Sequence, residues 1–521
     1  MSEIQPSQKQ IVAVIDIGSS AIRMVVAELG PKTEIRRLEN LQKPVAFGKD
    51  VFSTGRISRP VMREGLTILK NYKNIIDSYG ITTVHAIATS AVRDAVNRES
   101  FIDQAFVRAG IDVEIIEGPE ENRLELLAVE HAFGDKYEYQ SKKCLIIEVG
   151  SGSLEIIVLN QGEVGLTRTI SLGTSRLPEQ LVPGKSSVDI FKRVIKRTVR
   201  EISQHLCREY DLKQIDTFIA LGGDMRFAAK QLSPSGSEEF TILSKKSFVD
   251  FSAGVSKIPV EDLVEKFSLS YSEAETLYPA LLFYGNFMEE TGAKELVVPI
   301  TNIRDGLLIE LSQFFSGLKR TDVSKQVISS ARQMGKKYQY DEPHSLCVAS
   351  LAIKLFDLLK QEHGLGTRER LLLEVSAILH DIGMFISSTA YHKHSSYLVD
   401  SAEIFGLRKS DKNIVSNVVR YHRRSLPMPS HEPYMSLPRM DRVVVSKLAA
   451  ILRVAGALDK SRQQKIKTFH MEKQDDVYTI WIPEEVGDFT VERDSLTKRG
   501  NMFAEVFGVT IDLKQGNPSK V

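Results

Sequence analysis

Residues 11–28 read IVAVIDIGSSAIRMVVAE, and residues 144–159 read CLIIEVGSGSLEIIVL. Each segment consists of an apolar run, an acidic residue, a turn of glycine and serine, and a second apolar run. Short apolar runs bounded by turn residues are typical of buried strands, so both segments are predicted to be β-hairpins. Two such hairpins in one chain indicate a duplicated fold whose halves carry equivalent turns.

The two turns suit an anionic ligand. Glycine lets backbone N–H groups approach an anion closely, and serine adds hydroxyl donors. Asp16 and Glu148, which precede the turns, can hold a divalent cation or orient a water molecule beside that anion. We therefore expect the two halves to close on one phosphate-bearing ligand.

Composition excludes several classes of protein. A chain of 521 residues with 42% hydrophobic and 26% charged residues is typical of a soluble protein with about three or four domains. Its first residues are polar and it contains no apolar run of about 18 residues, so we expect a cytoplasmic protein without a membrane partner. A net charge of +1 favours no nucleic-acid partner. Three cysteines without CxxC spacing exclude a disulfide framework.

The chain changes character twice along its length. Up to about residue 310, strand-like runs alternate with helical patterns, which is typical of an α/β fold. Beyond about residue 316 the pattern is helical and includes seven of the eleven histidines, and strand-like runs return after residue 467. The predicted domains are 1–130, 131–315, 316–466 and 467–521.

Individual elements follow from the same patterns. Hairpins at the turns, and the absence of GxGxxG after the first strand, argue against a Rossmann sheet. Strands are expected at 11–16, 22–28, 83–88, 112–116, 143–148, 154–159, 217–221 and 296–300. Helices are expected at 60–78, 98–109, 119–132, 186–208, 272–287, 304–315, 322–335, 342–364, 367–381, 394–404, 410–422 and 440–460.

Three further segments have both a functional and a structural interpretation. In residues 88–93, ATSAVR, hydroxyl donors precede Arg93, whose planar guanidinium suits a phosphoryl oxygen. The same segment is also a normal helix N-terminus. Residues 221–224, LGGD, either admit a ligand or join a strand to a helix, and residues 117–122, EGPEEN, are typical of a helix start.

Six segments together resemble one family. DIGSS, ATSAVRDA, EGPEENRLELLAVEHA, EVGSGSLEIIV, LGGDMR and IRDGLL occur in the order and spacing of the exopolyphosphatase / guanosine pentaphosphate phosphohydrolase family. The resemblance covers nearly the whole chain. It implies an α/β N-terminal half with a duplicated actin-like fold of the acetate and sugar kinase type. It also implies an all-α HD-type domain followed by a small α+β C-terminal unit.

The resemblance assigns roles to individual residues. Glu121 would be the catalytic carboxylate that activates a water molecule for attack on the terminal phosphoryl group. Glu148 and Glu155 would stand where the family has acidic ligands for Mg²⁺ or Mn²⁺. The residues of the phosphate path would be Gly18, Ser19, Ser20, Arg93, Gly150, Ser151, Gly152, Ser153, Gly222 and Gly223.

The chain departs from the family's pattern at three of these places. Glu148 replaces the usual Asp, Ser20 replaces the usual Asn, and Asp224 follows Gly222–Gly223 where the family has Thr. A carboxylate at residue 224 would repel phosphate unless a cation intervenes. The departures leave Glu121 in place and bear on rate and substrate.

The helical region resembles HD phosphohydrolases in a second set of residues. His344, His380, Asp381 and Asp459 follow the order of their metal ligands, which implies a second divalent transition metal. His392, His394 and His422 are candidates for extending such a site. The alternative is a degenerate HD fold whose histidines are core or surface residues.

The sequence predicts an exopolyphosphatase that releases orthophosphate from inorganic polyphosphate. Guanosine pentaphosphate, hydrolysed to the tetraphosphate, is the alternative substrate. Three other functions remain open: a non-catalytic sensor of these polyphosphates, a kinase or ATPase of the same fold, and an HD-domain phosphohydrolase. By family analogy we expect a homodimer.

Overall fold

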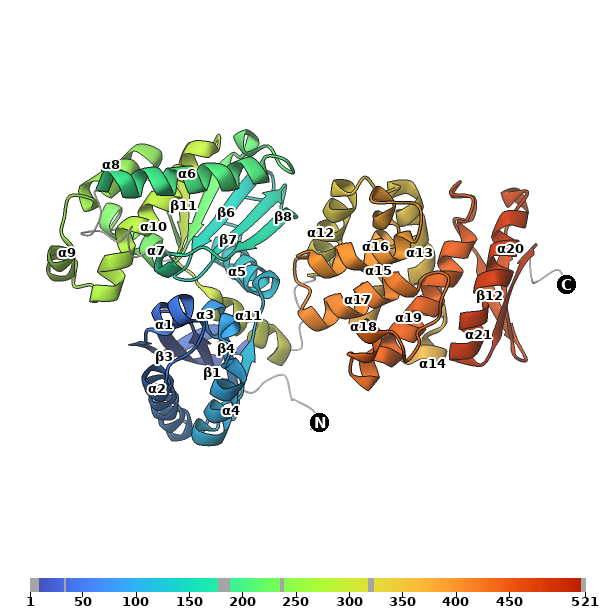
Figure 1. Ribbon diagram of the computed structural model, residues 1–521, viewed down its shortest axis with the longest axis horizontal. Coiled ribbons are helices and arrows are strands. Elements are labelled where there is room, and N and C mark those ends of the chain that lie inside the picture. Colours follow the sequence, from blue (N-terminus) through green and yellow to red (C-terminus); the bar gives the residue numbers. More distant parts are fainter. Residues whose placement is uncertain (1–8, 32–33, 177–187, 235–238, 317–322, 517–521) are drawn as a thin grey trace. The chain divides into compact units, whose positions relative to one another are not determined.

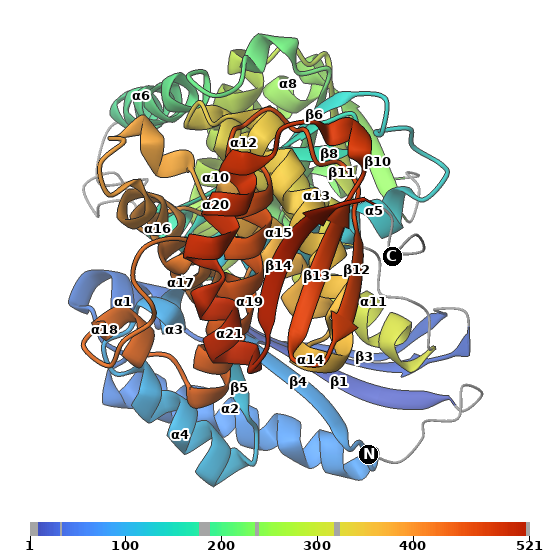
Figure 2. The same cartoon turned by 90° about the vertical axis from the view of Figure 1, so that its right-hand side faces the viewer.

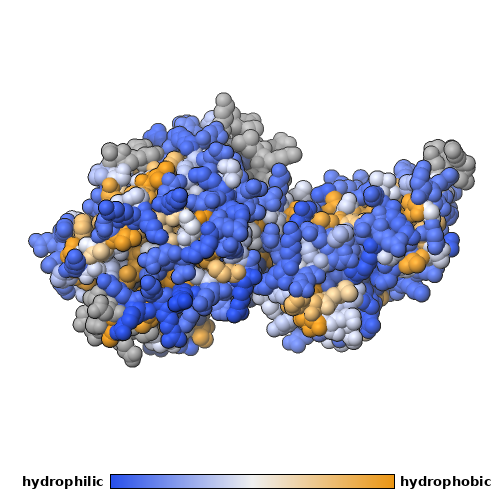
Figure 3. Space-filling model, turned by 90° about the horizontal axis from the view of Figure 1, so that it is seen from above, coloured by the Kyte–Doolittle hydropathy of each residue, from blue (hydrophilic) through white to orange (hydrophobic). Residues whose placement is uncertain are grey.

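The computed structural model describes residues 9–31, 34–176, 188–234, 239–316 and 323–516. The chain divides into two compact units, residues 1–323 and 324–521. The finer division into four domains stays a prediction. Within the described ranges, the helices lack the combination of length and apolar character that spanning a membrane requires. The face in Figure 3 is mostly hydrophilic, with small hydrophobic patches.

The first sheet of the first unit has five strands in the order β3-β2-β1-β4-β5. The pairs β1–β2 and β2–β3 are antiparallel, whereas β4 lies parallel to β1 and β5 parallel to β4. Its strands are β1 (Gln10–Ile17), β2 (Ala21–Leu29), β3 (Ile35–Pro44), β4 (Thr83–Ala88) and β5 (Val113–Ile115). Its helices are α1 (Phe47–Thr54), α2 (Arg59–Ser78), α3 (Ser90–Asp94), α4 (Arg98–Ala109) and α5 (Gly118–Phe133).

The second sheet has six strands in the order β10-β11-β9-β6-β7-β8. Its strands are β6 (Lys143–Val149), β7 (Leu154–Asn160), β8 (Glu163–Ile170), β9 (Thr217–Leu221), β10 (Phe240–Ser244) and β11 (Glu295–Pro299). Its helices are α6 (Val188–Leu206), α7 (Gly223–Leu232), α8 (Lys245–Val255), α9 (Val260–Phe267) and α10 (Tyr271–Glu290). α11 (Ile303–Phe315) follows β11 and packs against the first sheet. The first two residues of the helix expected at 186–208 lie outside the described ranges.

The two sheets repeat one topology. In each, a three-stranded antiparallel meander is followed by parallel strands, and β10 is an additional edge strand on the second sheet. Both hairpin turns close with the same bond: Gly18 N donates to Ala21 O at 3.0 Å, and Gly150 N donates to Ser153 O at 2.9 Å. Both predicted hairpins are thereby confirmed, and the repeated mixed sheets fit the α/β class expected for this half.

Helices cover both faces of the first sheet. Along β1, Ala13 and Ile15 pack into the core with α2 and α4, whereas Val12 and Val14 pack against α5 and α11. This explains why residues 11–15 of β1 are all apolar, since a strand buried on both faces shows no alternation. Figure 1 shows α5 and α11 between the two sheets. The sheets are therefore joined through these two helices.

The second unit begins with helices. α19 is buried along most of its length and packs against α13, α15 and α17. α13 begins where the Asp341 side chain accepts a hydrogen bond from His344 N at 3.1 Å, a normal N-cap. The helices are α12 (Ser324–Lys337), α13 (Glu342–Leu358), α14 (Lys360–His363), α15 (Thr367–Leu379), α16 (Tyr391–Ser401), α17 (Lys409–Tyr421), α18 (Glu432–Met435) and α19 (Arg439–Leu458).

A three-stranded sheet ends the second unit. Its order is β12-β13-β14, with β12–β13 antiparallel and β13–β14 parallel. The parallel connection runs through two helices that pack on α19, and Figure 2 shows them beside the sheet. The elements are β12 (His470–Gln474), β13 (Val477–Ile482), α20 (Thr490–Arg499), α21 (Asn501–Phe507) and β14 (Thr510–Gln515).

Candidate active site

A cavity of about 360 Å³ in the first unit is lined by residues from both sheets. Both glycine turns open into it, as do the N-terminal ends of α3 and α7 and the first part of α5. The residues of the predicted phosphate path that line the cavity are Gly18, Ser19, Ser20, Gly150, Ser151, Gly152, Ser153 and Gly223. Arg93 and Gly222 are not among the lining residues.

The two turns approach each other closely. The Oγ atoms of Ser19 and Ser90 lie 3.0 Å apart. A Cβ added to Gly152 would lie 2.3 Å from Ser90 Oγ and 2.9 Å from Ser19 Oγ, so only glycine fits there. The backbone of the second turn therefore faces hydroxyl groups of the first half, and both halves can contact one ligand.

Glu121 is buried in the first turn of α5, where Pro119 helps to start the helix. Its Oε1 forms an ion pair with Arg93, which also donates to Ile116 O at 2.7 Å. Burial raises the pKa of Glu121, and the charge of Arg93 opposes that rise. A carboxyl group whose pKa lies above its ordinary value is better suited to accept a proton near neutral pH.

Three more glutamates share the cavity with Glu121. Glu148 and Glu155 are direct partners across the β6–β7 hairpin, and Glu125 lies one turn after Glu121 on α5. Burial, followed by the neighbouring carboxylates, raises the pKa of Glu125 and Glu155 well above the usual range. Within the described part of the chain, Oε1 of Glu155 is buried and has no hydrogen-bond partner.

These carboxylates fit a divalent cation. Buried like charges require either protons or a cation between them, and clustered carboxylate oxygens are the donors that Mg²⁺ and Mn²⁺ prefer. The unpartnered Glu155 oxygen is a further donor for such an ion. Glu125 was not predicted as a ligand, although its i, i+4 spacing from Glu121 places both on the same face of α5.

Sequence reasoning also missed the cations of the cavity, which are Arg23, Arg226 and Arg304. Arg226 donates to Thr301 O at 2.6 Å, and Arg304 donates to Asn40 Oδ1 at 3.2 Å. Arg226 belongs to the motif LGGDMR and Arg304 to the motif IRDGLL, so the family motifs could have indicated both cations. Arginines fixed in this way can bind phosphoryl oxygens.

Asp224 also lines the cavity, beside Arg226 in sequence. Burial raises the pKa of Asp224 to about 7, against the opposing charge of Arg226. Near neutral pH this carboxyl group is therefore partly protonated. Its predicted repulsion of phosphate is correspondingly reduced.

In the second unit, His344, His380 and Asp381 come together. One ligand atom from each lies within 4.8 Å of those of the other two. Asp459 is placed differently, because its Oδ2 lies 2.8 Å from Nδ1 of His344. Burial lowers the pKa of His380 and lowers that of His422 further, so both imidazoles are neutral at neutral pH.

Models of one protein family match both units of the chain. The model of the Ppx/GppA phosphatase family matches residues 25–314, more than half of the chain. The chain belongs to the Ppx/GppA phosphatase family. The model of Ppx/GppA phosphatase domain III matches residues 328–496, within the second unit. As a Ppx/GppA member, the chain is a hydrolase that acts on phosphoanhydride bonds.

Curated relatives of this Ppx/GppA chain span its length. Guanosine-5'-triphosphate,3'-diphosphate pyrophosphatase of Pseudoalteromonas translucida is 23% identical over 97% of both chains. The enzyme of that name from Photobacterium profundum is 22% identical over 85% of this chain and 84% of its own. An exopolyphosphatase structure from Cytophaga hutchinsonii has a TM-score of 0.54 and 21% identity, and covers 60% of this chain and 99% of its own. That likeness shows the shared fold.

Proposed function

We propose that the protein removes the terminal phosphoryl group of inorganic polyphosphate and releases orthophosphate. The observation that carries this proposal is the position of Glu121. Its buried carboxyl group, with a raised pKa, lines a cavity together with two glycine–serine turns and three arginines. A proton acceptor beside several phosphate-binding groups suits attack by water on a phosphoanhydride.

The proposed step is an attack by water on the terminal phosphorus. The carboxylate of Glu121 accepts a proton from a water molecule while the water oxygen forms a bond to the terminal phosphorus. The bond between that phosphorus and the bridging oxygen breaks, and the shortened polyphosphate leaves with the electron pair. Arg93 holds the Glu121 carboxylate through their ion pair. It therefore acts as a positioning residue.

Binding of the substrate is assigned to the turns and the arginines. Ser19, Ser151 and Ser153 offer hydroxyl groups and backbone N–H groups on both sides of the cavity. Arg226 and Arg304 offer fixed positive charge, since each is held by an oxygen of the protein. Together they would orient a terminal phosphoryl group toward Glu121.

Glu148 and Glu155, with Glu125, would hold Mg²⁺ or Mn²⁺. When bound, such an ion supplies positive charge that stabilises the phosphoryl oxygens. The protein's own contribution is to keep these buried carboxylates together.

Guanosine pentaphosphate is the second candidate substrate. The observation that favours it is the activity named for the two curated relatives, guanosine-5'-triphosphate,3'-diphosphate pyrophosphatase, which match this chain along most of their length. Both substrates end in a phosphoanhydride, so the same Glu121 step serves either.

The test measures orthophosphate release from long-chain polyphosphate and from guanosine pentaphosphate, each with Mg²⁺ or Mn²⁺. Glu121→Gln is expected to lose about 10²- to 10⁴-fold in rate, whereas the exposed Glu99→Gln serves as matched control. The double variant His380→Ala/Asp381→Ala should retain activity. Loss of activity only in that double variant would instead move the chemistry to the second unit. Binding without turnover in every protein would favour a sensor.

Three other expectations belong to this proposal. We infer a homodimer, a cytoplasmic location, and an HD-type character for the helices of the second unit. Sedimentation and fractionation experiments test the first two. The HD-type character depends on the cluster of His344, His380 and Asp381 in the second unit.

A further inference from the structure

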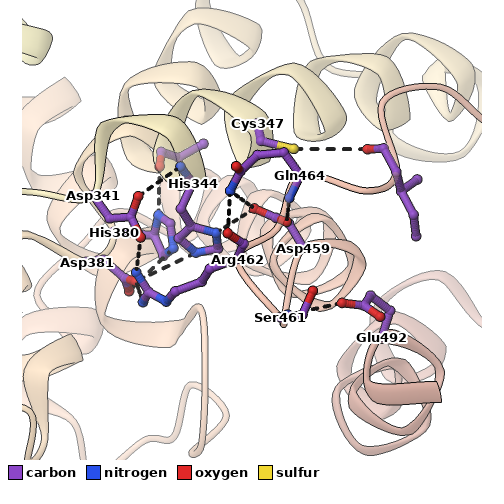
Figure 4. Close-up of polar contacts among 12 residues, drawn as sticks. Asp341, His344, Cys347, His380, Asp381, Asp459, Ser461, Arg462, Gln464 and Glu492 are labelled. Atoms are coloured by element: carbon purple, nitrogen blue, oxygen red, sulfur yellow. Dashed lines mark hydrogen bonds and ion pairs between the residues drawn. The ribbon is translucent and has the colours of Figure 1, made fainter. Parts of the chain in front are cut away.

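Three imidazoles surround the carboxylate of Asp381 in the second unit. Nε2 of His380 lies 3.4 Å from Asp381 Oδ1, and Nε2 of His422 lies 3.7 Å from the same atom. Nε2 of His344 lies 3.7 Å from Asp381 Oδ2. All four side chains are buried. Figure 4 shows His344, His380 and Asp381 gathered in one place.

In each histidine, the hydrogen bond made by Nδ1 fixes which ring nitrogen carries the proton. Nδ1 of His380 lies 2.7 Å from Ala377 O, and Nδ1 of His422 lies 2.6 Å from Val419 O. A carbonyl oxygen only accepts, so both Nδ1 atoms donate. Nδ1 of His344 likewise donates to the Asp459 carboxylate at 2.8 Å. With Nδ1 engaged in this way, each ring turns its Nε2 toward Asp381, which is how metal-binding histidines are normally held.

Two atoms at the centre of the cluster lack partners. Oδ1 of Asp381 and Nε2 of His422 are buried without a hydrogen bond to any described residue. A buried acceptor facing other acceptors is unfavourable unless a cation lies between them. If the cluster were only a hydrogen-bonded polar core, each of these two acceptor atoms would have a donor as its partner. The arrangement therefore points to a bound cation.

We propose that His344, His380, Asp381 and His422 bind one divalent transition metal ion, with Asp459 as the residue that positions His344. A ligand set of three imidazoles and one carboxylate favours Zn²⁺, Co²⁺ or a similar first-row ion over Mg²⁺. The site lies outside the chemistry assigned to the first unit. It is independent of the proposed polyphosphate hydrolysis.

This assignment changes the ligand set expected from the sequence. Oδ2 of Asp459 receives the His344 bond, and its Oδ1 accepts from Gln464 N at 2.8 Å. Both oxygens are thereby engaged in hydrogen bonds. His422, whose Nε2 has no hydrogen-bond partner in the described part of the chain, takes the fourth position instead.

Arg462 is a competing cation. It forms ion pairs with Asp381 and, at 3.0 Å, with Asp341. Its side chain is 32% exposed, whereas that of Asp381 is 3% exposed, and Figure 4 shows Arg462 beside Asp381. Arg462 pairs with Oδ2 of Asp381, so its positive charge opposes a metal ion that binds the unpartnered Oδ1. Removal of Arg462 should therefore strengthen metal binding.

The test titrates the metal-free full-length chain with Zn²⁺ by calorimetry and with Co²⁺ by visible absorption, which reports imidazole ligands. The Glu148→Gln/Glu155→Gln background removes carboxylates of the first unit that could bind a cation. We expect one ion per chain, lost in His380→Ala and in His422→Ala. Asp459→Ala should weaken binding about 10- to 100-fold and shift the Co²⁺ spectrum. Arg462→Ala should tighten binding.

His470→Ala is the matched control, because it removes an imidazole that is 61% exposed and lies outside the cluster. Its affinity should equal that of the parent. Equal Zn²⁺ affinity in the parent, His380→Ala and His422→Ala would overturn the proposal. If the histidine variants fail to fold by circular dichroism, the opposite shifts of Asp459→Ala and Arg462→Ala decide instead. Phosphate release, measured separately, tests only the first unit.

Discussion

Arg93 and Glu121 form a buried ion pair, with side chains 12% and 7% exposed. From the sequence, Arg93 was expected to bind phosphate and Glu121 to act as the base. The structure joins the two, and Arg93 lies behind the carboxylate rather than in the cavity lining. The charge of Arg93 therefore opposes the rise that burial causes in the pKa of Glu121.

Arg93→Ala should shift the pH dependence of activity. Burial raises the pKa of Glu121 and Arg93 lowers it, so removing Arg93 raises the pKa further. Glu121 must be deprotonated to accept a proton, so the acidic limb of kcat/KM should move to higher pH. Arg93→Lys, which keeps the charge, should lie between wild type and Arg93→Ala. The exposed Arg108→Ala serves as control, and an unchanged acidic limb in Arg93→Ala would contradict the assigned role.

The buried glutamates should couple stability to pH and to divalent cations. The folded-state pKa values of Glu125 and Glu155 are raised, so the folded protein holds their protons more tightly than the unfolded chain does. The contribution of these two groups to stability is therefore full below the ordinary glutamate pKa and is lost as pH rises toward their folded-state values. Without metal, this contribution to Tm should fall as pH rises above the ordinary glutamate pKa.

Added Mg²⁺ should restore Tm at the higher pH, because the ion replaces the protons. Glu155→Gln should reduce both the loss at high pH and the gain from Mg²⁺, while Glu99→Gln should keep both. Differential scanning calorimetry measures each curve. A Mg²⁺ gain equal in Glu155→Gln and wild type would exclude Glu155 as a ligand.

Asp224 should make substrate binding sensitive to pH. Its pKa of about 7 means that it becomes charged as pH rises through neutrality. We expect KM for polyphosphate to increase over that interval at constant saturating metal. In Asp224→Asn, KM above neutrality should be about fivefold lower, the factor given by about 1 kcal/mol of charge repulsion. Asp250→Asn, a surface change, should follow wild type, and parallel KM curves for all three proteins would contradict this prediction.

The hairpins and the start of α5 could be predicted because their information is local. An apolar run, a glycine–serine turn and a second apolar run are contiguous, and Gly118–Pro119 marks the start of α5. Strands β3, β8 and β10 were missed. β3 reads IRRLENLQKP on a sheet edge, where partly exposed residues leave no apolar run.

The cations and the histidine tautomers could not be predicted in the same way. Arg226 and Arg304 follow different strands, β9 and β11, and meet only when the second sheet forms. Isolated arginines are also common on surfaces. Asp459 and His344 are far apart in sequence, so the bond between them, and hence the role of His422, requires the folded second unit.

The packing of α5 against α11 should be essential, since α5 carries Glu121. A Cβ on Gly306 would lie 2.2 Å from the backbone oxygen of Leu124, an atom that cannot rotate away. Gly306→Ala should therefore push the two helices apart and cost about 1–3 kcal/mol of unfolding free energy. It should also lower kcat, because Glu121 moves with α5.

Gly254→Ala is the matched control. Gly254 lies in α8 with no atom within 4 Å of an added Cβ. There the substitution should stabilise the protein by about 0.5–1 kcal/mol, since alanine favours a helix over glycine. Urea denaturation of both variants, together with phosphate release, measures the contrast. If Gly306→Ala matched Gly254→Ala in stability and activity, the close contact between α5 and α11 would not constrain the position of Glu121.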